Sequence, residues 1–151
     1  MIGDHPLADH LGFLLRRAQL MIFADFHERM GDLEVTPATF SVLAILRAFP
    51  RIRQNRLTEI MAIKPANGVT LINSLEKRGL LAREKLPVSG RAVALSLTEA
   101  GAALLNEADK RVDSHREHFR ALLGDRDQEV LFALLRRLIE PEPSPPKTRS
   151  R

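Results

Sequence analysis

The chain has 151 residues, of which 44% are hydrophobic and 28% charged, with a formal net charge of +4. This length suits one sizeable core, or one subunit of an intertwined dimer. Cysteine is absent, which excludes disulfides and thiol-based redox sensing. No stretch approaches the roughly 18 apolar residues of a membrane span. The first ten residues lack the order of a signal peptide, so we expect a cytoplasmic protein with no membrane partner.

The positive charge is concentrated in the middle of the chain. Residues 47–91 contain ten Lys/Arg and three Asp/Glu, a net charge of +7, whereas the remainder carries −3. A basic middle between acidic ends is typical of a nucleic-acid site. The alternative is chance clustering on a solvated surface.

Apolar periodicity predicts a first helix over residues 6–30. Its apolar residues recur at spacings of three and four from Leu7 to Met30, which is one helical stripe. Phe13, Leu20 and Phe23 lie off that stripe. A helix that is apolar on more than one side is buried on more than one side, which indicates a second subunit as one of its partners.

Turn and capping residues define the elements that follow. Thr36-Pro37 and Thr98 are helix starts, Gly79 is a left-handed helix end, and Gly124-Asp125 is a break. In chain order we predict helices at about 37–49, 54–61 and 65–78, strands at 80–86 and 91–97, and helices at 99–123 and 127–139. The Pro-rich tail, residues 141–151, is expected to be disordered.

Two short helices followed by two strands and a basic loop are the order of a winged helix-turn-helix. This motif places its second helix in the DNA major groove and the loop beside it. The predicted fold is therefore mainly α with a small β-wing, comprising six helices and a two-stranded wing. Reading DNA is the function that this layout favours.

The segments LTEIMAI, ANGVTLINSLEKRGLL and RAVALSLTEAGAALL resemble the MarR family of bacterial transcriptional regulators. The resemblance covers about residues 6–139. It implies an intertwined homodimer, usually a repressor, whose N- and C-terminal helices interlock. It also implies a small ligand, often a phenolic or aromatic carboxylate, bound between the dimer helices and the DNA-reading lobe.

That resemblance also divides the chain. We expect a dimerisation helix at 1–34, a DNA-binding lobe at 35–98, C-terminal dimerisation helices at 99–140 and a disordered tail at 141–151. The partners expected are a second copy of the chain, a pseudo-palindromic double-stranded operator, and a small effector.

Two positions depart from the family pattern. The wing usually reads Asp-Pro-x-Asp-Arg-Arg, but residues 86–91 read Leu-Pro-Val-Ser-Gly-Arg, so only the second Arg survives, as Arg91. Such a wing lacks its usual ion pairs. Gly68 stands where a β-branched residue is common. It either allows a close approach of the preceding helix or is merely tolerated.

Helix 65–78 has one face for packing and one for reading. Gly68, Leu71, Ile72 and Leu75 share the packing face, and the opposite face is polar. Asn can form paired hydrogen bonds to adenine, and Thr, Ser and Val can contact several base edges. Basic residues around it suit phosphates, which position the protein without specifying sequence, and Arg91 suits a narrow minor groove. The DNA-binding candidates are Arg53, Gln54, Lys64, Pro65, Asn67, Val69, Thr70, Asn73, Ser74, Lys77 and Arg91.

Five residues on otherwise apolar helices are candidates for effector binding: Arg16, Phe23, His27, Phe40 and His115. A cation would hold a carboxylate or phosphate, and Phe rings would flank an aromatic ring. The plainer interpretation is that these aromatic residues belong to the core. We hypothesise that an aromatic carboxylate, or its coenzyme A thioester, releases the DNA.

Alternatives to a ligand-responsive repressor remain. His115 and His118 have the i, i+3 spacing of metal ligands, but no third ligand is evident, so no metal site is predicted. A zinc-responsive regulator and a helical interaction protein without DNA binding are the alternatives. No phosphate loop, nucleophile elbow or metal-hydrolase motif appears, so neither enzyme activity nor a cofactor is expected.

Overall fold

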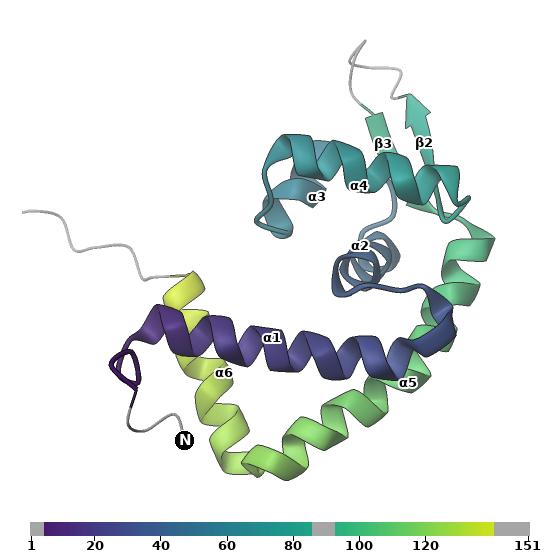
Figure 1. Ribbon diagram of the computed structural model, residues 1–151. Coiled ribbons are helices and arrows are strands. Elements are labelled where there is room, and N and C mark those ends of the chain that lie inside the picture. Colours follow the sequence, from purple (N-terminus) through teal and green to yellow (C-terminus); the bar gives the residue numbers. More distant parts are fainter. Residues whose placement is uncertain (1–4, 86–92, 141–151) are drawn as a thin grey trace, which may run out of the picture. The chain divides into compact units, whose positions relative to one another are not determined.

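Six α-helices, one short 3-10 helix and a three-stranded sheet make up the computed structural model, which describes residues 5–85 and 93–140 (Figure 1). In chain order these are α1 (Leu11–Met30), η2 (Gly31–Leu33), α2 (Pro37–Ala48), β1 (Ile52–Arg53), α3 (Gln54–Ile60), α4 (Pro65–Lys77), β2 (Leu81–Lys85), β3 (Val93–Leu97), α5 (Glu99–Leu123) and α6 (Asp125–Ile139). The predicted mainly helical fold with a small sheet is confirmed. Of the helices in the described part, none has the length and apolarity that crossing a membrane requires.

The sheet has one strand more than the sequence predicted. Its order is β1-β3-β2, and all pairs are antiparallel. Leu81 pairs with Leu97 at one end of β2. β1 comprises only two residues and pairs Ile52 with Leu95. The sequence does not predict β1 because two residues cannot show an alternating pattern.

The chain divides into two compact units, Met1–Asp113 and Ser114–Arg151, with the boundary inside α5. The first unit contains two buried clusters. The larger joins α2, α3, α4, the sheet and the start of α5; its buried members are Val42, Leu43, Leu46, Ile52, Leu57, Ile72, Leu75, Leu80, Leu81, Leu95 and Leu105. The smaller joins the end of α1 to α5 and consists of Phe26, Met30, Val35, Ala108 and Val112.

The predicted helix caps are present. The Thr39 amide donates to Thr36 Oγ1 at 3.1 Å, and the Gly101 amide donates to Thr98 Oγ1 at 3.0 Å. Gly79 has φ +71°. Around it, the Leu80 amide donates to the carbonyl of Leu75, the paired C-terminal bond that a left-handed glycine permits.

The end of α4 and the beginning of α5 meet at one joint. Thr98 Oγ1 donates to the Gly79 carbonyl at 2.6 Å, and the Thr98 amide donates to the Leu80 carbonyl at 3.3 Å. A Cβ on Gly101 would lie 2.0 Å from that same Leu80 oxygen. Only glycine allows α5 to begin so close to the backbone that follows α4.

The first helix is shorter than predicted. It begins at Leu11, not at residue 6, because residues 5–10 form turns in which the Ala8 amide donates to the His5 carbonyl at 2.8 Å. Pro6 occupies the second position of this turn, where its fixed φ is favoured. At its other end, α1 is connected to α5 by Arg111, which donates to the Met30 carbonyl at 2.5 Å.

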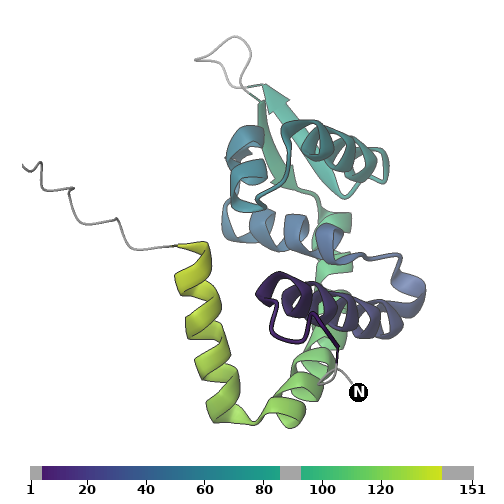
Figure 2. The same ribbon diagram turned by 60° about the vertical axis from the view of Figure 1, so that its left-hand side comes forward.

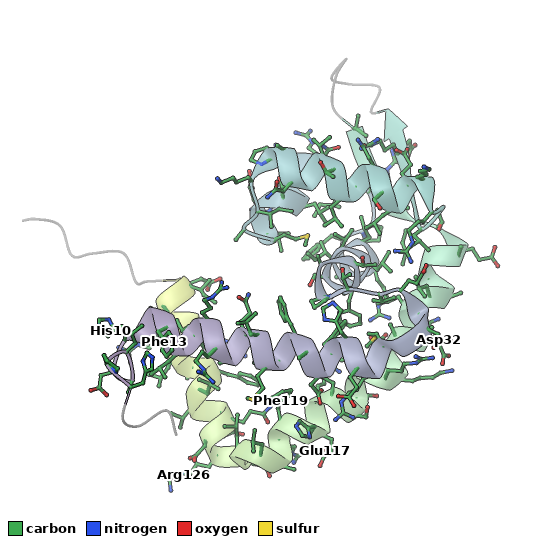
Figure 3. All side chains as sticks on the ribbon, viewed as in Figure 1. His10, Phe13, Asp32, Glu117, Phe119 and Arg126 are labelled. Carbon is green, nitrogen blue, oxygen red and sulfur yellow. The ribbon has the colours of Figure 1, made fainter. Side chains whose placement is uncertain are left out.

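Asp32 in η2, directly after α1, provides a second contact with α5. Arg111 also donates to Asp32 Oδ1 at 2.9 Å. Figure 3 shows Asp32 at the end of α1 remote from His10 and Phe13. The hydrogen bond from Arg111 lowers the pKa of Asp32 below its ordinary value of 3.8. The charged carboxylate thus pairs with Arg111 and links η2 to α5.

In the second unit, α6 begins at Asp125, two residues before the predicted start. Gly124 precedes it with φ +77°, a conformation that glycine adopts without steric cost. No residue of α6 is buried. Its exposed apolar side chains are Val130, Leu131, Phe132, Leu134, Leu138 and Ile139.

Candidate nucleic-acid interface

α4 has the two faces that its sequence predicts. Ile72 and Leu75 are fully buried in the larger core cluster, and Gly68 is buried beside α3. In both ribbon views α4 lies next to β2 (Figures 1 and 2). The opposite face is open to solvent; its exposed members are Ala66, Asn67, Val69, Thr70, Asn73, Ser74 and Lys77. The packed face thus fixes α4 while its polar face remains available.

Gly68 brings α3 and α4 together, which resolves the two interpretations of this glycine. A Cβ on Gly68 would lie 2.2 Å from Cγ2 of Thr58 in α3, closer than the 3.0 Å that real Cβ atoms essentially never go below. Thr58 is itself 6% exposed. A β-branched side chain at position 68 has no room at this helix spacing.

The beginnings of α3 and α4 lack side-chain caps. Neither Arg53 nor Lys64, the residues preceding these helices, forms a side-chain capping bond, and neither first turn holds an acidic residue. Arg53, Lys64 and Pro65 are exposed, and Gln54 is half-buried. In the first turn of α3 the Arg56 amide donates to Asn55 Oδ1 at 2.9 Å. Helix starts with adjacent cations and no acidic residue suit a phosphate group.

One residue that the sequence did not single out reaches the exposed face of α4. Arg83 on β2 donates from Nη2 to Asn73 Oδ1 at 2.6 Å and from Nη1 to Glu76 Oε2 at 2.5 Å. The Thr70 hydroxyl donates to the Ala66 carbonyl at 3.1 Å. An amide and a carboxylate three residues apart on α4, followed by an Arg on the next strand, are the only sequence signal for this bridge. Residues 86–92, which include Arg91 and the predicted wing loop between the two strands, lie outside the described residues.

The predicted effector residues fall in separate places. Phe40 is half-buried and packs edge-on against Phe26, with ring centroids 5.9 Å apart. His27 is exposed, contacts the same Phe26 ring at 6.3 Å, and has Nδ1 2.6 Å from the Phe23 carbonyl. Phe23 is 39% exposed. Phe40 and His27 thus share one aromatic neighbour at the end of α1.

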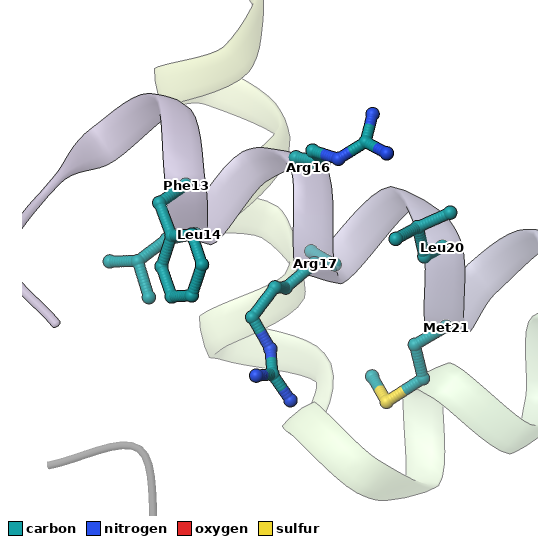
Figure 4. A pocket seen from close by; sticks show the side chains of 7 residues that line it. Phe13, Leu14, Arg16, Arg17, Leu20 and Met21 are labelled. Carbon is teal, nitrogen blue, oxygen red and sulfur yellow. The ribbon is translucent and has the colours of Figure 1, made fainter. Parts of the chain in front are cut away.

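Arg16 lies further towards the start of α1, beside an open hollow of about 720 Å³. The residues of α1 that line this hollow are Phe13, Leu14, Arg16, Arg17, Ala18, Leu20 and Met21. Figure 4 shows Arg17 directed to the same side as Phe13 and Met21, and Arg16 directed to the opposite side. The Arg17 guanidinium lies 5.8 Å from the Phe13 ring centroid, and His5 stacks on that ring at 5.3 Å.

His115 belongs to the second unit, where it packs edge-on against Phe119 with ring centroids 5.0 Å apart. His118 contacts the same ring at 5.1 Å. Among residues 5–85 and 93–140, no three His, Asp or Glu side chains are grouped as a metal site requires.

Residues 35–93 match the MarR family. Over 141 residues the chain is 30% identical to the putative transcriptional regulatory protein for the hcr operon of Thauera aromatica, which covers 93% of this chain and 85% of that protein. The chain belongs to the MarR family. It is accordingly a transcriptional regulator and not an enzyme.

Solved structures of MarR-family regulators have the same fold. The transcriptional repressor CouR bound to a 23-mer DNA duplex is 36% identical, with a TM-score of 0.84 over 89% of this chain and 95% of that one. CouR bound to p-coumaroyl-CoA is 34% identical, with a TM-score of 0.84 over 91% and 97%. PcaV from Streptomyces coelicolor, in complex with its natural ligand, is 29% identical, with a TM-score of 0.82 over 90% and 96%.

Proposed function

We propose that this MarR-family chain is a homodimeric repressor that reads a pseudo-palindromic operator with α4 and releases it when an aromatic carboxylate, or its coenzyme A thioester, binds. The observation that carries the proposal is the two-faced α4. Its buried Ile72 and Leu75 fix the helix on the lobe, while Thr70, Asn73 and Lys77 face solvent. A helix held in this way can enter the major groove without losing its packing.

Phosphate contacts would come from the cations around α4. Arg53 and Lys64 precede uncapped helices, and Lys77 ends the reading helix. From the resemblance we assign Arg91 to the minor groove beside the wing. Such contacts orient the lobe, and base contacts from Asn67, Val69, Thr70, Asn73 and Ser74 supply the sequence preference.

The domain division expected from the sequence belongs to the same proposal. Residues 1–34 and 99–140 would form the dimer, 35–98 the DNA-binding lobe, and 141–151 a tail outside both. α6 exposes a stripe that includes Leu131, Leu134 and Leu138. Surface apolar patches of this kind mark interaction sites, and a second copy of the chain is the partner that the family resemblance implies.

For the effector, two places on α1 support an anionic aromatic ligand. One is the Phe26 ring, which His27 on α1 and Phe40 on α2 both contact, with Phe23 one turn before His27. The other is the hollow beside Arg16 and Arg17, where a guanidinium and an aromatic ring lie together. A guanidinium suits a carboxylate or a phosphate, and an apolar wall suits an aromatic acyl group. His115 stays a candidate from the second unit.

The DNA-binding part is tested with duplex DNA from the region upstream of the chain's own gene. If the dimer neutralises about 6–10 phosphates, affinity falls about 10³- to 10⁵-fold between 50 and 200 mM salt. Lys77→Ala should weaken binding to all sequences and reduce the salt slope by about 1. Lys110→Ala is the matched control, because Lys110 is an exposed lysine on α5 that pairs with Glu107. Equal effects of the two variants would contradict the assignment of α4.

Self-association is tested by placing a charge on α6. Leu134→Lys should convert a dimer at micromolar concentration to a monomer in light scattering, because an unpaired charge in an apolar interface is strongly unfavourable. Ala133→Lys introduces the same charge at the neighbouring exposed residue, away from the Leu131–Leu138 stripe. A parent chain that is monomeric, or dimers in both variants, would remove the proposed interface.

The effector is tested by calorimetry and mobility shift with benzoate, salicylate, hydroxycinnamates and their thioesters. Each tenfold loss of operator affinity corresponds to about 1.4 kcal/mol of coupling between ligand and DNA. Comparing ligand binding by Arg16→Ala and by Arg17→Ala shows which of the two guanidinium groups at the hollow binds the anionic group of the ligand. If none of these ligands alters DNA binding while zinc does, the effector class is wrong and the DNA-binding proposal stands alone.

A further inference from the structure

Arg83 connects β2 to the exposed face of the reading helix. Its guanidinium donates to Glu76 Oε2 at 2.5 Å and to Asn73 Oδ1 at 2.6 Å. Asn73 and Glu76 are three residues apart on α4 and therefore lie side by side on its surface. The fixed fork of a guanidinium spans two such acceptors at once, which a lysine cannot do in the same geometry.

Glu76 anchors the bridge. The Arg83 and Glu76 side chains are 28% and 38% exposed, so each is partly withdrawn from water. A charge-assisted bond of this length is stronger than a bond between neutral groups. The guanidinium is thereby held in place, and its second nitrogen is directed at Asn73.

The chemistry of the guanidinium fixes which way the Asn73 amide faces. Arg carries only donors, so the atom that meets it is the amide oxygen. The amide nitrogen, with its two hydrogens, is then the group left for another partner. The second lone pair of Oδ1 stays open, but the adjacent positive charge disfavours a partly positive amino hydrogen there.

We propose that Arg83 is a specificity-determining residue that makes Asn73 act as a hydrogen-bond donor towards the bases. This inference rests on the proposed function, in which α4 reads the major groove. An unconstrained Asn pairs with adenine by donating to N7 and accepting from the N6 amino group. With its oxygen held by Arg83, Asn73 favours edges that offer acceptors, namely N7 and O6 of guanine or O4 of thymine.

The test selects binding sites for the full-length chain from a randomised duplex library and compares four variants. Asn73→Ala identifies the base position that Asn73 reads. Arg83→Met should change the preference at that same position towards adenine, by roughly 5-fold or more relative to guanine or thymine. In the double variant Asn73→Ala/Arg83→Met, the second substitution should add no further change at this base position, because the Asn73 side chain through which Arg83 acts is absent. Glu76→Ala, which releases the anchor but keeps Arg83, should change the same position.

Arg51→Met is the matched control. Arg51 also pairs with a glutamate, Glu84 on β2, at 3.2 Å. Its replacement should leave base preference unaltered. If Arg83 serves only as a phosphate contact, Arg83→Met weakens all sites uniformly and lowers the salt slope by about 1. That outcome, or an unchanged preference in both the Arg83 and Glu76 variants, overturns the inference while DNA reading by α4 stands. If the parent chain selects no sequence, the proposed function fails as well.

Discussion

Gly68→Ala provides a test in which helix propensity and tertiary packing predict opposite signs. In an isolated helix, replacing Gly with Ala is favourable by about 1 kcal/mol. In this structure the added Cβ would lie 2.2 Å from Thr58 Cγ2, whereas carbon atoms normally approach to about 3.5–4.0 Å. The two helices, or the Thr58 side chain, would have to move by more than roughly 1 Å.

Thr58 has little freedom to move. It is 6% exposed, and its hydroxyl donates to the Asn55 carbonyl at 2.8 Å. Overpacking a filled site costs about 1–3 kcal/mol, which exceeds the propensity gain. We expect Gly68→Ala to lower the free energy of unfolding by about 1 kcal/mol, and the melting temperature by about 2–4 °C.

Two companion variants make the reasoning specific. Thr58→Ser removes Cγ2 but keeps the hydroxyl, so it should recover most of the stability lost in Gly68→Ala. Gly12→Ala is the control, because Gly12 lies in α1 with no atom within 4 Å of the added Cβ; it should stabilise by about 0.5–1 kcal/mol. Urea unfolding at one fixed chain concentration measures all of them, since self-association would shift the midpoint. A Gly68→Ala chain as stable as the parent, or a serine that recovers nothing, refutes the argument.

Three further predictions concern the joints of the fold. Gly101→Ala should destabilise by about 3 kcal/mol, more than Gly68→Ala, because its Cβ would meet the backbone oxygen of Leu80, which cannot rotate away; urea unfolding checks this. Thr36→Ala should lower the free energy of unfolding by about 1 kcal/mol through loss of the α2 cap. In urea unfolding, the slope of the transition should be the same for this variant and the parent. Because the Arg111 bond lowers the pKa of Asp32, its charged form stabilises the fold above the ordinary value of 3.8 and this contribution is lost as the pH falls through the lower folded value. The midpoint difference between the parent and Asp32→Asn should therefore be present near pH 7 and shrink towards pH 3.

Local features were predictable because each is determined by a few adjacent residues. The caps at Thr36 and Thr98, the left-handed Gly79 and the packing face of α4 all depend on spacings within about one or two helical turns. Residues 6–10, which precede α1, were predicted as helix because the apolar periodicity continues past Pro6, a residue that favours a turn. β1 could not be recognised from two residues.

Tertiary features of the candidate site were not predictable in the same way. The role of Gly68 depends on how closely Thr58 approaches, and propensity alone gives it the wrong sign. The bridge from Arg83 depends on β2 lying beside α4, which places residues ten positions apart in contact. The pattern of a single sequence does not show which residues of a strand face which residues of a helix. Arg83 was therefore counted only as one cation of the basic segment.

The joint where α4 ends and α5 begins has a consequence for engineered chimeras. The Gly79 and Leu80 carbonyls both accept from Thr98, and the Gly101 position rests on the Leu80 oxygen. The stop signal of the reading helix and the start signal of the long helix are thus built from the same few backbone atoms. A hybrid regulator that takes its lobe from one parent and its long helix from another should keep residues 79–101 from a single parent, with the seams placed outside that stretch.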